Sequence, residues 1–143
     1  MSKIETNKAL VKRLLDEIWG REDFSHVEEF IAFPYTLFND PNDPWDGQSL
    51  DRDGFVERVR KSRAPFPDQK FTVVHWVADE TQVAIAWTWD ATHKGDIPGF
   101  PATGKTLAMS GMTIYPIVDG KITGHWQVAD RLTIGQQLMA NKA

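Results

Sequence analysis

The sequence predicts an α+β fold in which a strongly curved, mainly antiparallel sheet wraps around N-terminal helices as a cone. Two observations predict it. Residues 6–61 have the spacing of helices around one strand, and residues 70–130 hold four β-rich stretches. Because helices and antiparallel strands occupy separate parts of the chain, they are expected to pack as separate layers. The chain has 143 residues without a linker or repeat, so we expect one domain over residues 1–143.

The helices are predicted from apolar residues that recur at helical spacing. The first is expected over residues 6–19 and ends at Gly20. A short second helix is expected over about residues 23–31, and a third over residues 50–61. The residues after Asp130 are expected to form a short terminal helix.

The strands are predicted from alternating apolar and polar residues and from the turns between them. FPYTLFN, residues 33–39, is the first. The other stretches are KFTVVHWVA, TQVAIAWTWDATH, KTLAMSGMTIYPIV and KITGHWQVAD. The pair Asp119-Gly120 between the last two is a strong hairpin signal. Pro116 inside the third of these stretches predicts a bulge or a sheet edge there.

Composition excludes several classes of function. A formal net charge of −4 argues against nucleic-acid binding, and Arg58 and its basic neighbours are expected on the outer face and at the end of a helix. The absence of cysteine excludes thiol chemistry. No segment approaches 18 apolar residues, so we expect no membrane contact and a cytoplasmic location. No metal-ligand spacing is recognisable, so we expect neither metal nor cofactor.

Asp130 is the candidate acid/base residue. Alternation places it at the end of a predominantly apolar face that is expected to point inward, formed by Ile122, Gly124, Trp126 and Val128. A carboxyl group in apolar surroundings has a raised pKa and becomes a useful proton acceptor. An Asp directly before a helix is also a common N-cap, and the pattern by itself favours the cap.

Six tryptophans and eight phenylalanines are typical either of an aromatic core or of a pocket for flat ligands. His93 ends a predicted strand face that also carries Trp87 and Trp89. A lone histidine in such a place is more often structural than catalytic. The candidates for pocket walls are Tyr35, Trp45, Trp87, Trp89 and Trp126, and each is at least as well explained by core or interface packing.

Short motifs then follow one another along the chain. Their residues are Asn39-Asp40-Pro41, Phe66-Pro67-Asp68, Thr-His-x-Gly-Asp at 92–96, Pro-x-Thr-Gly-Lys at 101–105, Asp-Gly-Lys-Ile at 119–122, Trp126, Asp130 and Gln137-Leu138. Each motif alone is weak, but their order and spacing are specific. Over nearly the whole chain they resemble the SnoaL-like polyketide cyclases, also called predicted ester cyclases.

This resemblance implies the curved-sheet cone shared with nuclear transport factor two and ketosteroid isomerase. It also implies that Asp130 corresponds to the acid/base aspartate of the characterised cyclases, which close a ring by intramolecular aldol condensation on an aromatic polyketide ester without a metal or Schiff base. Asn39 and His93 would then hydrogen-bond substrate carbonyls or the developing oxyanion. The ligand would be a small hydrophobic carbonyl or aromatic compound.

Two other functions stay open. In a non-catalytic binding or accessory protein, Asp130 would be a fully bonded helix cap that titrates normally. An epoxide hydrolase or hydroxylase would need a second acid, for which Asp90 and Asp96 are the nearby candidates, and Asp90 lies on the face opposite His93. Because the aromatic strand residues cannot all fit inside one small cone, we also expect a homodimer or higher homo-oligomer.

Overall fold

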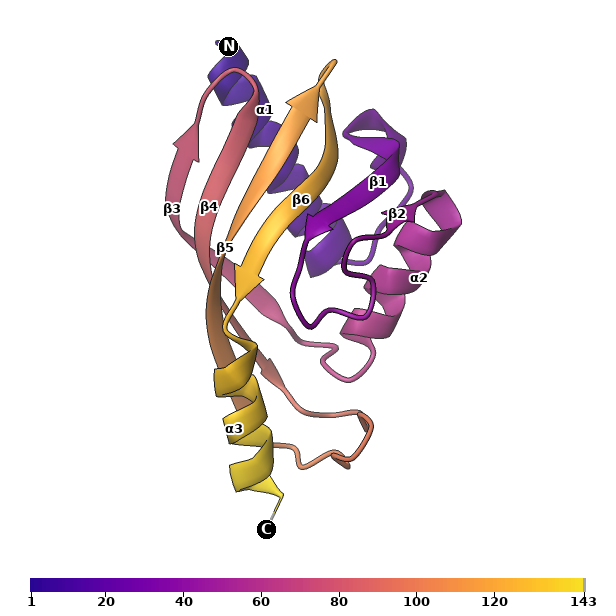
Figure 1. Cartoon of the computed structure of the whole chain (residues 1–143), viewed down its shortest axis with the longest axis vertical. Helices are drawn as coiled ribbons and strands as arrows, with labels where there is room; N and C mark the ends of the chain where they lie inside the picture. Colours follow the sequence, from indigo (N-terminus) through magenta and orange to yellow (C-terminus); the bar gives the residue numbers. More distant parts are fainter. Residues whose placement is uncertain (143) are drawn as a thin grey trace.

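Six strands form one sheet in the order β2-β1-β6-β5-β4-β3 (Figure 1). The computed structural model describes residues 1–142. All neighbouring strands are antiparallel except β1 and β6, which run parallel. The strands are β1 (Ile31–Asn39), β2 (Ser49–Leu50), β3 (Lys70–Ala78), β4 (Gln82–Thr92), β5 (Thr106–Val118) and β6 (Lys121–Ala129). The predicted α+β class with a mainly antiparallel sheet is confirmed.

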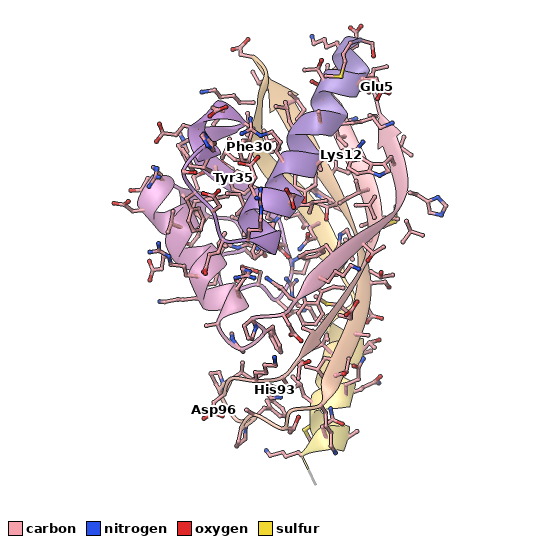
Figure 2. All side chains as sticks on the ribbon, turned by 180° about the vertical axis from the view of Figure 1, so that it is seen from behind. Glu5, Lys12, Phe30, Tyr35, His93 and Asp96 are labelled. Atoms are coloured by element: carbon pink, nitrogen blue, oxygen red, sulfur yellow. The ribbon has the colours of Figure 1, made fainter. Side chains whose placement is uncertain are left out.

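One long N-terminal helix crosses the sheet (Figure 2). It consists of α1 (Lys3–Arg13) and a π-helical continuation, η1 (Leu14–Gly20), and it ends at Gly20 as predicted. It begins earlier than predicted because Ser2 is the N-cap, and its side chain accepts a hydrogen bond of 3.1 Å from Glu5 N. The helix contacts β3, β4 and β6, so it covers the inner face of the sheet.

The other helices are shorter and lie at the sides and end of the sheet (Figure 1). The predicted second helix is only the 3-10 turn η2 (Val27–Glu29), because the chain enters β1 at Ile31. The α2 helix (Arg52–Arg63) follows its N-cap Asp51. The α3 helix (Arg131–Asn141) extends beyond the end of the sheet and packs against β5. No helix within residues 1–142 is long and apolar enough to span a membrane.

The core lies between the N-terminal helix and the inner face of the sheet. Its fully buried side chains include Val11, Leu14, Ile18, Phe30, Ile31, Leu37, Phe55, Ile85, Leu107 and Ile122. Burial of this apolar surface is the main favourable term that holds helix and sheet together.

A β-bulge in β6 changes which of its side chains point inward. Ile122 pairs with Ile117 of β5 and Trp126 pairs with Ile114, so two residues of β5 oppose three of β6. The extra residue inverts the alternation beyond it. The bulge lies opposite Pro116 of β5. A bulge or an edge was predicted in the strand of Pro116 itself, whereas the extra residue lies in the partner strand β6.

The predicted inward face of β6 is therefore wrong beyond the bulge. Ile122 is buried as expected, but Trp126 and Val128 are 47% and 49% exposed. His125 is buried, and His125 and Gln127 point to the inside instead. Simple alternation assumed an unbroken strand, and one extra residue was enough to exchange the two faces.

Candidate functional site

A cavity of about 260 Å³ lies between the inner face of the sheet, η1 and α2. Most of its wall is apolar and is formed by Leu15, Trp19, Phe66, Phe71, Ile85, Trp87, Trp89, Met109 and Ile134. One end is polar and is formed by Tyr35, Asp43, Arg58, His125, Gln127 and Arg131. An apolar cavity with a few converging polar groups is the usual form of a small-molecule site.

The polar end is organised around Asp40, which follows β1 and has no exposed surface. Its Oδ2 accepts hydrogen bonds from His125 Nε2 at 2.8 Å and Arg58 Nη2 at 3.2 Å. Its Oδ1 accepts one from Arg131 Nη1 at 2.9 Å. Gln127 Nε2 lies 3.3 Å from both oxygens. The carboxylate therefore joins side chains from α2, β6 and α3.

Two guanidinium groups balance two carboxylates at this end. Arg58 Nη2 lies 3.0 Å from Asp43 Oδ2, in addition to its contact with Asp40. Arg131 lies 2.9 Å from Asp40 and 3.5 Å from Asp43. Because each buried charge has a partner of opposite sign, the group can stay ionised inside the protein.

His125 lies between Asp40 and Tyr35. Its Nδ1 is 2.6 Å from the Tyr35 hydroxyl, and its Nε2 faces Asp40. An ionised carboxylate can only accept, so Nε2 carries the proton. In the neutral imidazole Nδ1 is then the acceptor, and the Tyr35 hydroxyl donates to it. We call this chain the Tyr35–His125–Asp40 relay.

The surroundings set the charges of the relay. Burial lowers the pKa of His125 below its ordinary value, although the hydrogen bond to Asp40 works in the opposite direction. Burial alone would raise the pKa of Asp40, but the hydrogen bond from His125 and the positive charges of Arg131 and Arg58 lower it overall. Burial raises the pKa of Tyr35 well above its ordinary value. At neutral pH the relay therefore consists of a phenol, a neutral imidazole and a carboxylate.

Hydrogen bonds fix the tryptophans of the apolar wall. Trp87 Nε1 donates to Thr113 Oγ1 at 2.8 Å, and this hydroxyl donates to Gln127 Oε1 at 2.7 Å. Trp89 Nε1 donates to Gln69 Oε1 at 2.8 Å. These bonds hold the indole rings of Trp87 and Trp89 in one orientation within the wall.

The structure brings together only part of the predicted pocket. Tyr35, Trp87 and Trp89 line the cavity. Trp45 packs against the core from the loop after β1, outside the cavity lining. Trp126 lies on the opposite face of the sheet because of the bulge in β6, so its predicted place in the pocket wall is wrong.

Asp130 is an exposed N-cap of α3. Its Oδ1 accepts a hydrogen bond of 3.1 Å from Thr133 N, and its Oδ2 accepts one from the Thr133 hydroxyl. These bonds lower the pKa of Asp130, so the raised pKa expected from an apolar face is not found. Asp130 borders a separate depression with Asp90 and Ser110. This placement favours the helix-cap alternative over the acid/base role.

His93 and Asn39 also lie outside the cavity lining. His93 is fully buried against Phe66, and within residues 1–142 neither of its ring nitrogens has a hydrogen-bond partner. Figure 2 places it near Asp96, far from Tyr35. Asn39 Nδ2 donates to the backbone oxygen of Gln127 at 3.1 Å and so ties β1 to β6.

The candidates for a second acid do not join the cavity either. Asp90 is exposed on β4, and Asp96 Oδ1 accepts a backbone hydrogen bond of 2.8 Å from Ala102 within its loop. Across residues 1–142, no three His, Asp or Glu side chains are grouped as a metal ion would require.

Sequence reasoning missed the residues that form the polar end. Asp40 stood inside the motif Asn39-Asp40-Pro41, but the run of turn-forming residues indicated only a loop. Arg58 was expected on an outer helix face, yet its side chain is 6% exposed, because Asp40 and Asp43 neutralise it from a loop distant in sequence. The sequence did contain one signal for the burial of this side chain: the arginine stands among apolar residues on the same helix.

Comparison with known proteins gives consistent results. The model of the family described as SnoaL-like polyketide cyclase matches residues 9–138. A proposed polyketide cyclase from Acidithiobacillus ferrooxidans is 44% identical, with a TM-score of 0.90 and full coverage of both chains. IdmH, a proposed polyketide cyclase from Streptomyces antibioticus, is 26% identical, with a TM-score of 0.75, over 94% of this chain and 96% of its own.

A third structure carries a different description. AclR, a proposed hydroxylase from Streptomyces galilaeus, is 24% identical, with a TM-score of 0.78, over 96% of this chain and 98% of its own. At this identity the likeness shows the fold alone. A search of curated proteins found no match.

Proposed function

The chain belongs to the SnoaL-like polyketide cyclase family, and on this premise we propose that it is a cofactor-free enzyme for intramolecular aldol condensation. Its substrate is a hydrophobic carbonyl compound held in the interior cavity. The observation that carries the proposal is the Tyr35–His125–Asp40 relay at the polar end of an aromatic cavity. The sequence similarity to a proposed polyketide cyclase supports the reaction class.

The relay accounts for proton removal. The Tyr35 oxygen takes a proton from an activated methylene of the substrate while the Tyr35 hydroxyl proton moves to His125 Nδ1. The imidazolium so formed is stabilised by Asp40, 2.8 Å from Nε2. Since the resting imidazole is neutral, it is available as the base at neutral pH.

The same groups serve the second half of the reaction. The enolate attacks a second carbonyl of the substrate, and the relay returns its proton to the new alkoxide. Arg58 and Arg131 line the same end of the cavity and supply positive charge for the developing oxyanions. The carbanion is delocalised into the conjugated carbonyls of the substrate, so no electron sink is needed from a cofactor.

Turnover of aromatic β-polyketone esters by three variants tests this proposal. Tyr35→Phe keeps the ring but removes the proton carrier, so we expect kcat to fall about 10²- to 10⁴-fold. His125→Gln is expected to lose a similar factor. Asp130→Asn is expected to keep wild-type kcat, because Asp130 is an exposed cap. Loss of activity in Asp130→Asn together with full activity in Tyr35→Phe would instead support the assignment based on the family motif.

A non-catalytic binding protein is the alternative. The hydrogen bonds of the relay support this alternative, because both ring nitrogens of His125 already have partners within the protein. In that case none of the three substitutions would change the fate of any carbonyl ligand, and only its affinity would respond.

We further propose that the protein forms a homodimer through the outer face of the sheet. Four exposed apolar side chains gather there, from β1, β5 and β6: Phe38, Met112, Trp126 and Val128. Met112 and Val128 are direct cross-strand partners, which makes part of the patch continuous. Exposed apolar patches of this kind are typical of protein–protein contacts.

A further inference from the structure

A surface groove of about 540 Å³ runs between the N-terminal helix and the edge strand β3. Its floor is formed by the partly buried side chains of Phe71, Val73 and Trp76. Lys12 and Asp16 flank it on the helix side, and Figure 2 labels Lys12 on that helix. No residue of the Tyr35–His125–Asp40 relay lines this groove.

One layer of side chains separates the groove from the interior cavity. Leu15, Trp19, Gln69 and Phe71 line both spaces. The rings of Trp19 and Phe71 meet edge to face, with centroids 6.2 Å apart. Trp19 is partly exposed and directly precedes Gly20 at the end of the π-helical segment η1, a kind of segment that is frequent at functional sites.

Gln69 brings an unpaired hydrogen-bond donor to this layer. Its Oε1 accepts from Trp89 Nε1, and an indole N–H can only donate, so the orientation of the amide is fixed. Its NH2 group is buried, and no acceptor within residues 1–142 bonds to it. Buried donors without a partner are rare in folded proteins, and an oxygen atom of a ligand at this place would pair with the Gln69 NH2 group.

We propose that the groove is a second subsite for the ligand of the interior cavity. The flat carbonyl core occupies the cavity, and an uncharged extension crosses the layer beside Gln69 and lies over Phe71 and Trp76. An oxygen at the crossing accepts a hydrogen bond from the Gln69 NH2 group. This inference rests on the proposed function, because it takes the cavity to be the site of the ligand core.

The charges along the groove favour an uncharged extension. Lys12 and Lys70 supply two positive charges, and Asp16 and Asp68 supply two negative charges. The Lys12 ammonium group also lies 5.5 Å from the ring centroid of Trp76, and this cation–π interaction partly satisfies its positive charge. Because the charges balance, neither an anion nor a cation is favoured, whereas an amide or hydroxyl group finds donors and acceptors of both kinds.

Calorimetric titration with three probes distinguishes binding in the cavity from binding in the groove. The probes are anthraquinone, which has only the core, its hydroxyethyl carboxamide, and its monocarboxylate. We expect the wild-type protein to bind the carboxamide about 3- to 10-fold more tightly than anthraquinone, as one or two net hydrogen bonds provide. The carboxylate is expected to bind no more tightly than the carboxamide.

Trp76→Ala removes the largest of the three side chains that form the floor of the groove, and Trp76 does not line the cavity. We expect it to reduce the advantage of the carboxamide, because the extension loses its contact with the Trp76 ring while the Gln69 hydrogen bond stays, and to change the Kd of anthraquinone less than about 2-fold. Lys12→Ala changes an exposed groove residue that does not threaten folding, and it is expected to reduce the same advantage. Trp126→Ala is the matched control, because Trp126 lines neither space, and it should keep the full advantage. Thermal unfolding verifies that each variant is folded.

Equal affinity of the wild-type protein for anthraquinone and the carboxamide would overturn the inference, as would an advantage that is undiminished in Trp76→Ala. In both cases anthraquinone still binds and the proposed function stands. A Tyr35→Phe variant with full turnover would overturn the proposed function but leave the preference for the carboxamide intact. Failure of anthraquinone to bind at all would overturn both.

Discussion

Replacing Asp40 with Asn tests whether one buried carboxylate holds the polar end of the cavity together. Asp40 has no exposed surface and accepts hydrogen bonds from Arg58, His125, Gln127 and Arg131. In Asp40→Asn one acceptor oxygen becomes an NH2 donor that faces other donors. The two guanidinium groups would then share a single carboxylate.

The expected loss of stability is large. Removing one partner of a buried ion pair costs about 3–5 kcal/mol, because the remaining charge stays buried without compensation. An unfolding entropy of about 2.1 cal/mol/K per residue gives about 0.3 kcal/mol/K for a chain of 143 residues. The Tm of Asp40→Asn should therefore lie about 10–17 °C below that of the wild-type protein.

Calorimetry and urea denaturation at neutral pH measure this loss. Asp90→Asn makes the same chemical change at an exposed position of β4 and should alter stability by less than about 0.5 kcal/mol. If Asp40→Asn lowers Tm no more than Asp90→Asn does, the carboxylate is not the centre of this network and the reasoning from its contacts fails.

Four further outcomes follow from the structure. Burial lowers the pKa of His125 from its ordinary 6.5, so just below that pH the unfolded chain binds more protons than the folded protein. The free energy of unfolding, measured by urea titration, should therefore fall as the pH is lowered from about 7 to 5. A rise over this range would contradict the direction of the shift. His93→Phe should raise stability by about 1 kcal/mol in thermal melts, because it replaces a buried ring whose nitrogens have no partner. A lower Tm would show that the histidine has a partner. Gly124→Ala should lower the free energy of unfolding by about 3 kcal/mol, because the new Cβ would lie 2.0 Å from a carbonyl oxygen of β1. The control Gly135→Ala in α3 adds a Cβ that meets nothing within 4 Å, and it should raise stability in the same melts. Trp126→Glu should convert the proposed dimer to a monomer in light scattering, and a wild-type protein that is already monomeric at micromolar concentration would refute the dimer.

Local patterns were sufficient to predict most of the fold. Apolar residues at helical spacing placed α2 to within two residues, and Asp119-Gly120 placed the turn between β5 and β6. The start of the long helix was less well predicted, because Ser2 caps it about one turn before the predicted start at residue 6. The sheet order could not be read from the chain, since the parallel contact of β1 with β6 depends on tertiary packing.

The site was less predictable for a physical reason. Its centre is formed by residues 18 to 91 positions apart in sequence from Asp40, and no local pattern records such pairings. The bulge in β6 then moved His125 to the inside and Trp126 to the outside. The family motif pointed to Asp130 just after β6, whereas the alternation rule chose the wrong face of that strand beyond the bulge.

The pairing of β1 with β6 has a consequence for how the chain folds. Most contacts between β3, β4, β5 and β6 join neighbours in sequence and can form as the chain emerges from the ribosome. β1 must instead wait, with one edge unpaired, until a partner about 90 residues downstream has been synthesised. Asp40, His125 and Arg131 can therefore meet only after β6 and the start of α3 have been synthesised. A chain interrupted before β6 would leave β1 free to pair with other molecules.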